Sequence, residues 1–293
     1  MSMRDLMEDV REPKPSSPQR MTRGEVVVRI LGYVLLTVAA LTMMIPFLWM
    51  VSTSLKPLSE VQSGHFLPQV WKFGNYHEVI ETIPYGRYYF NSIFVAMWVT
   101  LGQVLTCAAA AYAFSRVRWR FRDQVFLLYL ATLMVPGLVT LIPNYYVLTT
   151  LHLINTYTVL ILPACFSAYG TFLLRQFMLT IPASLDEAAE IDGASHWQIF
   201  WDVVMPLARP GLIVLAIFTF MGNYQSFFWP LVMIKDDFLR TLPIGLLYFD
   251  SSYGRETTLL MAASVMAMIP LIVLFVVGQK FFVKGIQLGA VKG

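Results

Sequence analysis

The chain has 293 residues, of which 57% are hydrophobic and only 13% are charged, and its formal net charge is +3. The charged fraction is about half that of an average soluble domain. One core could not bury this much apolar surface, so we expect lipid to cover the excess. The small net charge gives no indication of nucleic-acid binding. Composition therefore predicts an integral membrane protein.

Six stretches are long and apolar enough to cross a hydrocarbon layer of about 30 Å, which takes about 20 residues of helix. The predicted spans are approximately Val27–Val51, Tyr89–Phe114, Val125–Ile142, Tyr157–Leu174, Pro210–Ile234 and Thr258–Phe282. Several contain proline, which membrane helices tolerate because neighbouring groups satisfy the freed carbonyls. We therefore predict an all-α membrane protein with about six spans. A disordered cytoplasmic tail over residues 1–23 precedes a transmembrane domain over residues 24–293.

The distribution of basic residues predicts the orientation, because Lys and Arg are enriched in cytoplasmic loops. Fifteen of the 21 lie at the two ends of the chain, between spans two and three, or at the loop between spans four and five. Four of these fall within seven residues, Arg116, Arg118, Arg120 and Arg122. Only six lie in the other loops. Both termini are predicted to be cytoplasmic.

The spans contain almost no ionisable side chain away from their ends. Proton-coupled and sodium-coupled carriers and voltage sensors need such groups, so these classes are disfavoured. The sequence also has no G-x-x-x-x-G-K-[ST] pattern that would hold a nucleotide phosphate. Energy for uphill transport would come from another polypeptide docked on a cytoplasmic surface. Cys107 and Cys165 lie in apolar runs and the histidines are scattered, so neither a disulfide nor a metal site is predicted.

The loop after span four, Ile181–Gly211, has a distinctive pattern. Ser184 and Glu187 are three residues apart, which predicts a capping box at the start of a short helix. Gly193 predicts a sharp turn at its end. A second segment, Ala194–Val204, carries its large apolar residues at helical spacing on one predicted face. These residues are Trp197, Phe200, Trp201 and Val204.

Glu187-Ala188-Ala189, the glycine four residues later and the closing Met205-Pro206-Leu207 resemble the EAA loop of ABC-importer permeases. Val204-Met205-Pro206 stands where that pattern usually reads Ile-x-Leu-Pro, a small departure that keeps the proline. The resemblance implies that Leu185–Trp197 is a coupling helix that inserts into a cleft of an ATPase. The coupling residues it implies are Asp186, Glu187, Ala188, Ala189, Asp192, Gly193 and Trp197.

The resemblance extends over about residues 25–293, and the C-terminal third is similar to the carbohydrate branch, MalG-like (maltose, multiple-sugar and alginate-oligosaccharide type). The motifs that carry it are Phe228-Trp229-Pro230-Leu231, Thr241-Leu242-Pro243 and the ending Gly285–Gly293. The implied partners are a second related permease, two ATPase subunits carrying ATP and Mg, an extracytoplasmic solute-binding protein, membrane lipid and an oligosaccharide. The chain itself would be non-catalytic and hold no cofactor, and the resemblance implies a place in a bacterial cytoplasmic (inner) membrane. Gly289 and Lys292 would contact an ATPase, and the outer loop Lys235–Thr257 would reach the binding protein.

A solute path is predicted in span five, because a sugar must exchange its hydrogen bonds with water for bonds with protein. Its candidate residues are Asn223, Tyr224, Gln225 and Trp229. Gln225 and Trp229 are four residues apart and would share a helix face. Hydrogen bonding between helices and an interfacial tryptophan remain an alternative explanation. Asn144, Tyr145 and Tyr146 are interpreted as interface anchors rather than a gate.

Two other functions stay open at the level of sequence. One is an ABC importer for another solute class, such as amino acids, polyamines or phosphate. The other is an ATP-independent carrier or channel. The sequence does not choose between neutral and acidic sugars, nor between a homodimeric and a heterodimeric permease pair.

Overall fold

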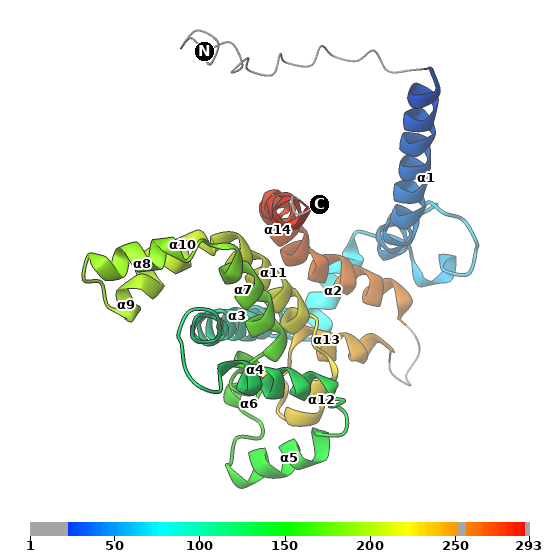
Figure 1. The fold of residues 1–293 in the computed structure, drawn as a ribbon. Coiled ribbons are helices and arrows are strands. Elements are labelled where there is room, and N and C mark those ends of the chain that lie inside the picture. The colour runs from blue at the N-terminus through cyan, green and yellow to red at the C-terminus, as the bar shows by residue number, and fades with distance from the viewer. Residues whose placement is uncertain (1–22, 251–255, 291–293) are drawn as a thin grey trace. The chain divides into compact units, whose positions relative to one another are not determined.

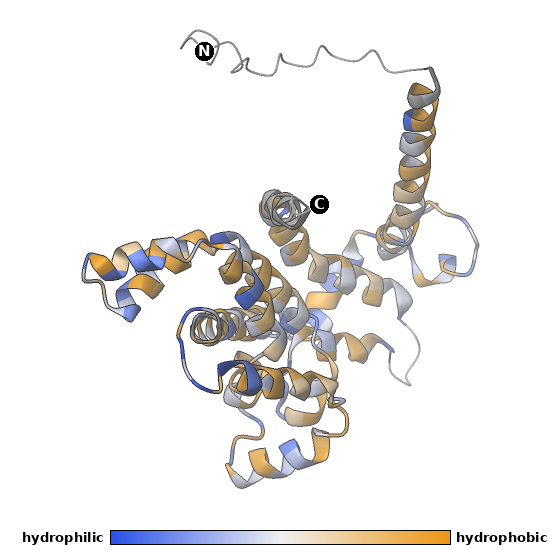
Figure 2. Cartoon of the chain, in the orientation of Figure 1, coloured by the Kyte–Doolittle hydropathy of each residue, from blue (hydrophilic) through white to orange (hydrophobic). Residues whose placement is uncertain are grey.

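The computed structural model describes residues 23–250 and 256–290, and the regular elements over these residues are helices. The chain divides into two units, Met1–Trp49 and Met50–Gly293. The first unit is described through α1 (Arg23–Ser54), an apolar helix that contains Pro46 and ends in the second unit. The predicted tail before it lies outside the described residues. Figure 2 shows hydrophobic residues along α1 and a hydrophilic loop before α4.

The second unit is a bundle of long helices joined by short ones (Figure 1). Its longer elements are α2 (Gly74–Thr82), α3 (Tyr85–Ser115), α4 (Arg122–Ala131), α5 (Leu141–Thr150), α7 (Ala168–Thr180), α8 (Ser184–Ile191), α11 (Arg209–Tyr224) and α14 (Thr257–Ala290). Its shorter ones are α6 (Tyr157–Ile161), α9 (His196–Gln198), α10 (Met205–Leu207), α12 (Phe228–Met233) and α13 (Leu242–Gly245). Single turns are η1 (Leu58–Glu60), η2 (Thr132–Met134), η3 (Pro163–Cys165), η5 (Asp237–Leu239) and η6 (Leu246–Asp250), and η4 (Ile199–Val204) is a π-helix.

Helix α3 organises this unit, because it packs against both α7 and α11 and supplies residues to all three buried apolar clusters. Tyr88 belongs to the cluster with α14, Val99 to the cluster with α6 and α12, and Ala108 to the cluster with α7 and η4. Close packing depends on small residues: a Cβ at Gly170 of α7 would lie 2.9 Å from the Cys107 sulfur of α3. Cys107 and Cys165 are free, as expected.

Within residues 23–250 and 256–290, four helices are long and apolar enough to cross a membrane. They are Val26–Ser54, Tyr85–Ser115, Tyr157–Thr180 and Thr257–Gln279, and a fifth is obtained if the pair His196–Leu207 and Arg209–Tyr224, bent by 77°, counts as one span. The predicted all-α membrane class is confirmed, and these helices correspond to predicted spans one, two, four, six and the first part of five.

The third predicted span, Val125–Ile142, is not one helix. Helix α4 ends at Ala131, and α5 begins only at Leu141. Between them Val135 is extended (φ −81°, ψ 116°), as expected for a residue that precedes a proline. The fifth predicted span, Pro210–Ile234, is likewise interrupted, because α11 ends at Tyr224 and α12 starts at Phe228. Apolar composition did not locate the interruption in either region.

Candidate functional sites: the loop after α7 and the pocket beside α12

The loop after α7 contains the predicted short helix, but its capping differs from expectation. Helix α8 begins after Ala183, whose backbone is already helical, and no side chain caps it. The predicted Ser184–Glu187 capping box is therefore wrong. Pro182 sets the entry to the helix one residue earlier than the serine would, which leaves Ser184 inside the first turn. The two acidic residues of that turn, Asp186 and Glu187, still stabilise the helix, because their negative charges lie at the positive end of its dipole.

A capping box is present instead at α9. The Ser195 hydroxyl accepts from the Gln198 amide nitrogen (3.4 Å), and the Gln198 side-chain oxygen accepts from the Ser195 amide nitrogen (2.8 Å). Gly193 joins α8 to α9 with φ of +83°, a left-handed conformation that costs other residues energy. The predicted turn is confirmed. The α9 capping box and the Gly193 turn make the hairpin of α8 and α9 a locally specified structure (Figure 1).

The segment after the turn is apolar on two adjacent faces, and the core covers one of them. Phe200 and Val204 are buried, whereas Trp197 is 67% exposed and Trp201 is also exposed. Consecutive residues such as Phe200 and Trp201 project from different sides of a helix. The four residues predicted to share one apolar face therefore lie on two, and the core covers only the face with Phe200 and Val204. The indole rings of Trp197 and Trp201 contact each other with centroids 5.7 Å apart.

Most of the predicted coupling residues are exposed, and one of them, Asp186, makes an ion pair within the chain. Glu187, Ala188, Asp192, Gly193 and Trp197 are exposed, and Ala189 is half-buried against the cluster of α3, α7 and η4. Ile191, which sequence reasoning did not select, is 86% exposed on the same hairpin. Its position directly before Asp192 and Gly193 was the available signal. An exposed isoleucine and tryptophan beside acidic groups form a surface suited to a protein partner.

Asp186 forms an ion pair with Arg116. Its carboxylate lies 3.1 Å from the Arg116 guanidinium, and the two side chains are 14% and 8% exposed. Burial raises the pKa of Asp186; Arg116 lowers that pKa, and the carboxylates of Glu190 and Glu187 raise it further. Arg116 was not selected as a site residue from the sequence. Its only signal was membership of the basic run between spans two and three.

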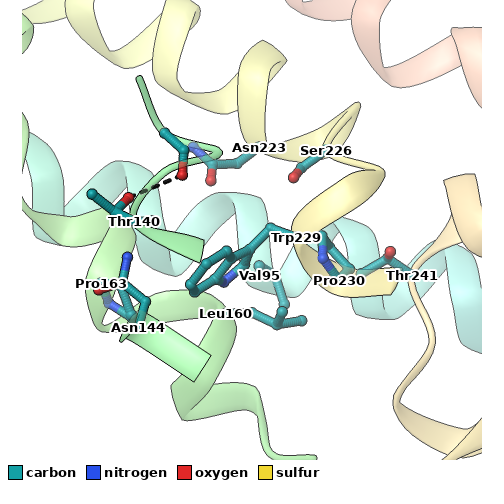
Figure 3. Close-up of a pocket in the computed structure, with 12 residues that line it drawn as sticks. Val95, Thr140, Asn144, Leu160, Pro163, Asn223, Ser226, Trp229, Pro230 and Thr241 are labelled. Carbon is teal, nitrogen blue, oxygen red and sulfur yellow. Dashed lines mark hydrogen bonds between the residues drawn. The ribbon is translucent and has the colours of Figure 1, made fainter. Parts of the chain in front are cut away.

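The second site is a pocket of about 360 Å³ in the second unit (Figure 3). Four neutral polar side chains, those of Thr140, Asn144, Asn223 and Ser226, gather around the indole of Trp229. The full lining is Val95, Gly137, Thr140, Asn144, Leu160, Pro163, Ala164, Asn223, Ser226, Trp229, Pro230 and Thr241. None of these lining residues is ionisable. Amide and hydroxyl groups beside an aromatic plane can bind an uncharged polar solute.

Two of the four predicted pathway residues line this pocket. Asn223 donates to the Thr219 carbonyl oxygen (2.8 Å), and the Trp229 indole nitrogen donates to the Val159 carbonyl oxygen (3.1 Å), which fixes both side chains. Tyr224 is buried, with its hydroxyl donating to the Ala267 carbonyl oxygen (2.9 Å), and Gln225 is exposed outside the pocket.

The predicted shared face of Gln225 and Trp229 does not form, because the helix ends between them. Asn144, interpreted from sequence as an interface anchor, lines the pocket instead. The signal that could have found it was the Pro136-Gly137 interruption, since broken membrane helices expose polar groups to a cavity.

Residues 102–288 match the family described as the binding-protein-dependent transport system inner membrane component. The chain belongs to this family of ABC-importer permeases and is a multi-pass membrane protein. It is similar to the arabinooligosaccharides transport system permease protein AraQ of Halalkalibacterium halodurans, at 32% identity over 85% of this chain and 91% of the relative. It is also similar to the sn-glycerol-3-phosphate transport system permease protein UgpE of Yersinia enterocolitica, at 36% identity over 70% of this chain and 74% of the relative.

Two solved structures resemble the fold. One is from a bacterial ABC transporter involved in the import of the acidic polysaccharide alginate, with a TM-score of 0.78, 26% identity and coverage of 91% of this chain and all of that one. The other is from a bacterial alginate ABC transporter in complex with an alginate pentasaccharide-bound periplasmic protein, with a TM-score of 0.57, 14% identity and coverage of 85% and 92%. The second shows likeness of fold alone.

Proposed function

We propose that this chain is one of two permease subunits of an ATP-driven importer that moves an oligosaccharide from an extracytoplasmic binding protein across the cytoplasmic membrane. The observation that carries the proposal is the pocket around Trp229, which is neutral, polar and bounded by interrupted helices. An oligosaccharide crossing the membrane needs hydrogen-bonding partners and a flat apolar surface, and this pocket supplies both. The arabinooligosaccharide and alginate relatives support the same substrate class.

The hairpin of α8 and α9 is the proposed coupling site. Its exposed Glu187, Ile191 and Trp197 would enter a cleft on one of two ATPase subunits, which would carry ATP and Mg. Binding of ATP would draw the ATPases together and move the hairpin, and the spans would open toward the binding protein. This chain would catalyse no reaction itself and hold no cofactor.

Three further assignments belong to the proposal. Both termini are placed in the cytoplasm on the distribution of Lys and Arg. Residues 24–293 are proposed to form one transmembrane domain. The C-terminal contact with an ATPase rests on Gly289, within α14, and on Lys292, which lies outside the described residues.

A second candidate is an importer for a phosphorylated polyol, favoured by the similarity to the sn-glycerol-3-phosphate permease. One experiment separates the two. The complex, reconstituted in vesicles with its binding protein, is supplied with a neutral oligosaccharide, an acidic oligosaccharide or sn-glycerol-3-phosphate, and ATP-dependent uptake is measured. We expect uptake of an oligosaccharide. Uptake of sn-glycerol-3-phosphate alone would replace the proposed substrate class with the second candidate.

A further inference from the structure

Helix α3 is attached by polar side chains at both of its ends. It runs without interruption over Tyr85–Ser115, so Asn91 and Arg116, which directly follows the last turn, are about 37 Å apart at 1.5 Å per residue. Both residues make buried or largely buried polar contacts with segments far away in sequence. One of these segments is the proposed coupling hairpin, and the other follows α12.

At one end, the Arg116 guanidinium joins three parts of the chain. Its Nη2 donates to the carbonyl oxygens of Met178 (2.6 Å) and Ile181 (2.8 Å), at the end of α7 and just beyond. Its Nη1 lies 3.1 Å from the carboxylate of Asp186, in the first turn of α8. A planar guanidinium can make several directed bonds at once, which a lysine cannot reproduce. Arg116 therefore ties the end of α7 and the start of α8 to α3.

Tyr112, one turn earlier on α3, holds the second arm of the same hairpin. Its hydroxyl donates to the His196 carbonyl oxygen (3.1 Å) at the start of α9, and its ring packs against Phe200 with centroids 5.2 Å apart. The hairpin is thus held on both sides of the Gly193 turn by two residues four apart in sequence, Tyr112 in the last turn of α3 and Arg116 directly after it. Residues at this spacing lie on the same helix face.

These polar contacts are a main attachment of α8, because apolar packing there is sparse. No residue of α8 is buried, and only Ala189 packs half-buried against the adjoining cluster. A pocket of about 540 Å³ lies beside the ion pair, lined in part by Arg118, Glu187 and Glu190. Loss of the Arg116–Asp186 contact would therefore loosen α8 from α3 without emptying a packed core.

At the other end, α3 holds the segment that follows α12. The Asn91 amide nitrogen donates to the carbonyl oxygens of Phe238 and Arg240, both at 2.8 Å, and its oxygen accepts from the Tyr157 hydroxyl (2.7 Å). The Ser92 hydroxyl accepts from the Leu242 amide nitrogen (2.8 Å). Val95, one turn further along α3, lines the pocket around Trp229. One helix therefore touches the coupling hairpin, the pocket and the segment 237–242.

We propose that α3 transmits displacement of α8 to the segment 237–242, with Arg116 and Asn91 as positioning residues at its two ends. The proposal rests on the proposed function, because it takes α8 as the part that an ATPase moves. A continuous helix with polar attachments at both ends moves as one body, so the ion pair at one end and the amide at the other act in series. Removal of either attachment should break the same connection.

The test uses the full reconstituted complex and measures how strongly the loaded binding protein stimulates ATP hydrolysis. Asp186→Asn and Asn91→Leu should each reduce stimulation about tenfold, the size expected from one lost charged or paired hydrogen bond. Because the two attachments act in series, the double variant should lose little more than the worse single variant. Asp123→Asn is the matched control, since that carboxylate also pairs with arginines, at 3.1 and 3.5 Å, but is 64% exposed. Full stimulation in Asp186→Asn, or simple additivity with Asn91→Leu, would overturn the proposal.

A second measurement does not depend on transport. Hydrogen exchange of the α8 amides is compared in the purified wild type, Arg116→Lys, Asp186→Asn and Asp123→Asn. Exchange in α8 should become about tenfold faster in the first two variants and stay unchanged in the control. Unchanged exchange in both variants would overturn the attachment itself. If wild-type hydrolysis responds to no loaded binding protein, the proposed function fails, whereas the exchange result still decides whether Arg116 positions α8.

Discussion

The hairpin of α8 and α9 and the pocket around Trp229 differ in charge, and the difference follows from where each works. The hairpin carries Asp186, Glu187, Glu190 and Asp192 within seven residues, and all but Asp186 are exposed. The pocket has only neutral lining residues. Charges at an aqueous edge cost little and can select a protein partner, whereas an unpaired charge inside a membrane costs several kcal/mol. Charge therefore distinguishes the proposed coupling site from the proposed solute path.

The largest expected effect is an all-or-none difference in thiol labelling, which tests whether the hairpin lies on the predicted cytoplasmic side of the membrane. Single cysteines are introduced at Ser195 of the hairpin and at Ser63, in the loop between α1 and α2 that is predicted to lie outside the cell, after Cys107 and Cys165 are replaced by alanine. With an impermeant thiol reagent on intact cells, Ser63→Cys should react and Ser195→Cys should be protected. After the membrane is opened, both should react. Labelling of Ser195→Cys in intact cells would place the hairpin outside and remove its coupling role.

Charge reversal on the hairpin should have the next largest effect. Glu187→Lys opposes the dipole of α8 and presents a positive charge to a partner selected for a negative one. A like-charge contact costs about 3 kcal/mol, so transport should fall about a hundredfold while membrane insertion is kept. Uptake in vesicles at matched protein content measures this. Wild-type uptake would show that Glu187 does not contact the ATPase.

Two neighbouring amides sharpen the assignment of the pocket. Asn223 lines the pocket and Gln225 does not, although they are two residues apart. Asn223→Leu removes a hydrogen-bonding group at similar volume and should lower uptake about tenfold. Gln225→Leu removes an exposed amide and should lower uptake less than twofold. The reverse order would favour the sequence-based assignment of Gln225 over the structural one.

The smallest effect concerns the turn between α8 and α9. Gly193→Ala places a Cβ in a left-handed conformation, which costs about 1–2 kcal/mol. Docking and uptake should fall about fivefold to tenfold. Gly86→Ala, at a helical glycine with open space around it, is the control and should have no measurable effect. Equal uptake in the two variants would mean that the hairpin tolerates a changed turn.

Composition and local sequence pattern were enough to predict the class of this protein and the turn in its most distinctive loop. Apolar length alone predicts α1, α3 and α14, because a membrane rewards each helix independently of its neighbours. The Gly193 turn is also local, since it depends on one residue's backbone freedom. The motif around Glu187 then led to the family, to which the match over residues 102–288 shows that the chain belongs.

Only the tertiary structure decided which residues meet. Arg116 and Asp186 are 70 positions apart, and nothing in either local sequence pairs them. The pocket combines α3, the interruption before α5, the turn after α6 and the start of α12, so its lining depends on where helices break and how they pack. Helical periodicity predicted that Gln225 lies beside Trp229. Because α11 ends at Tyr224, Gln225 lies outside the pocket whereas Trp229 lines it. Periodicity sets the faces of a helix while it continues, and packing determines what each face contacts.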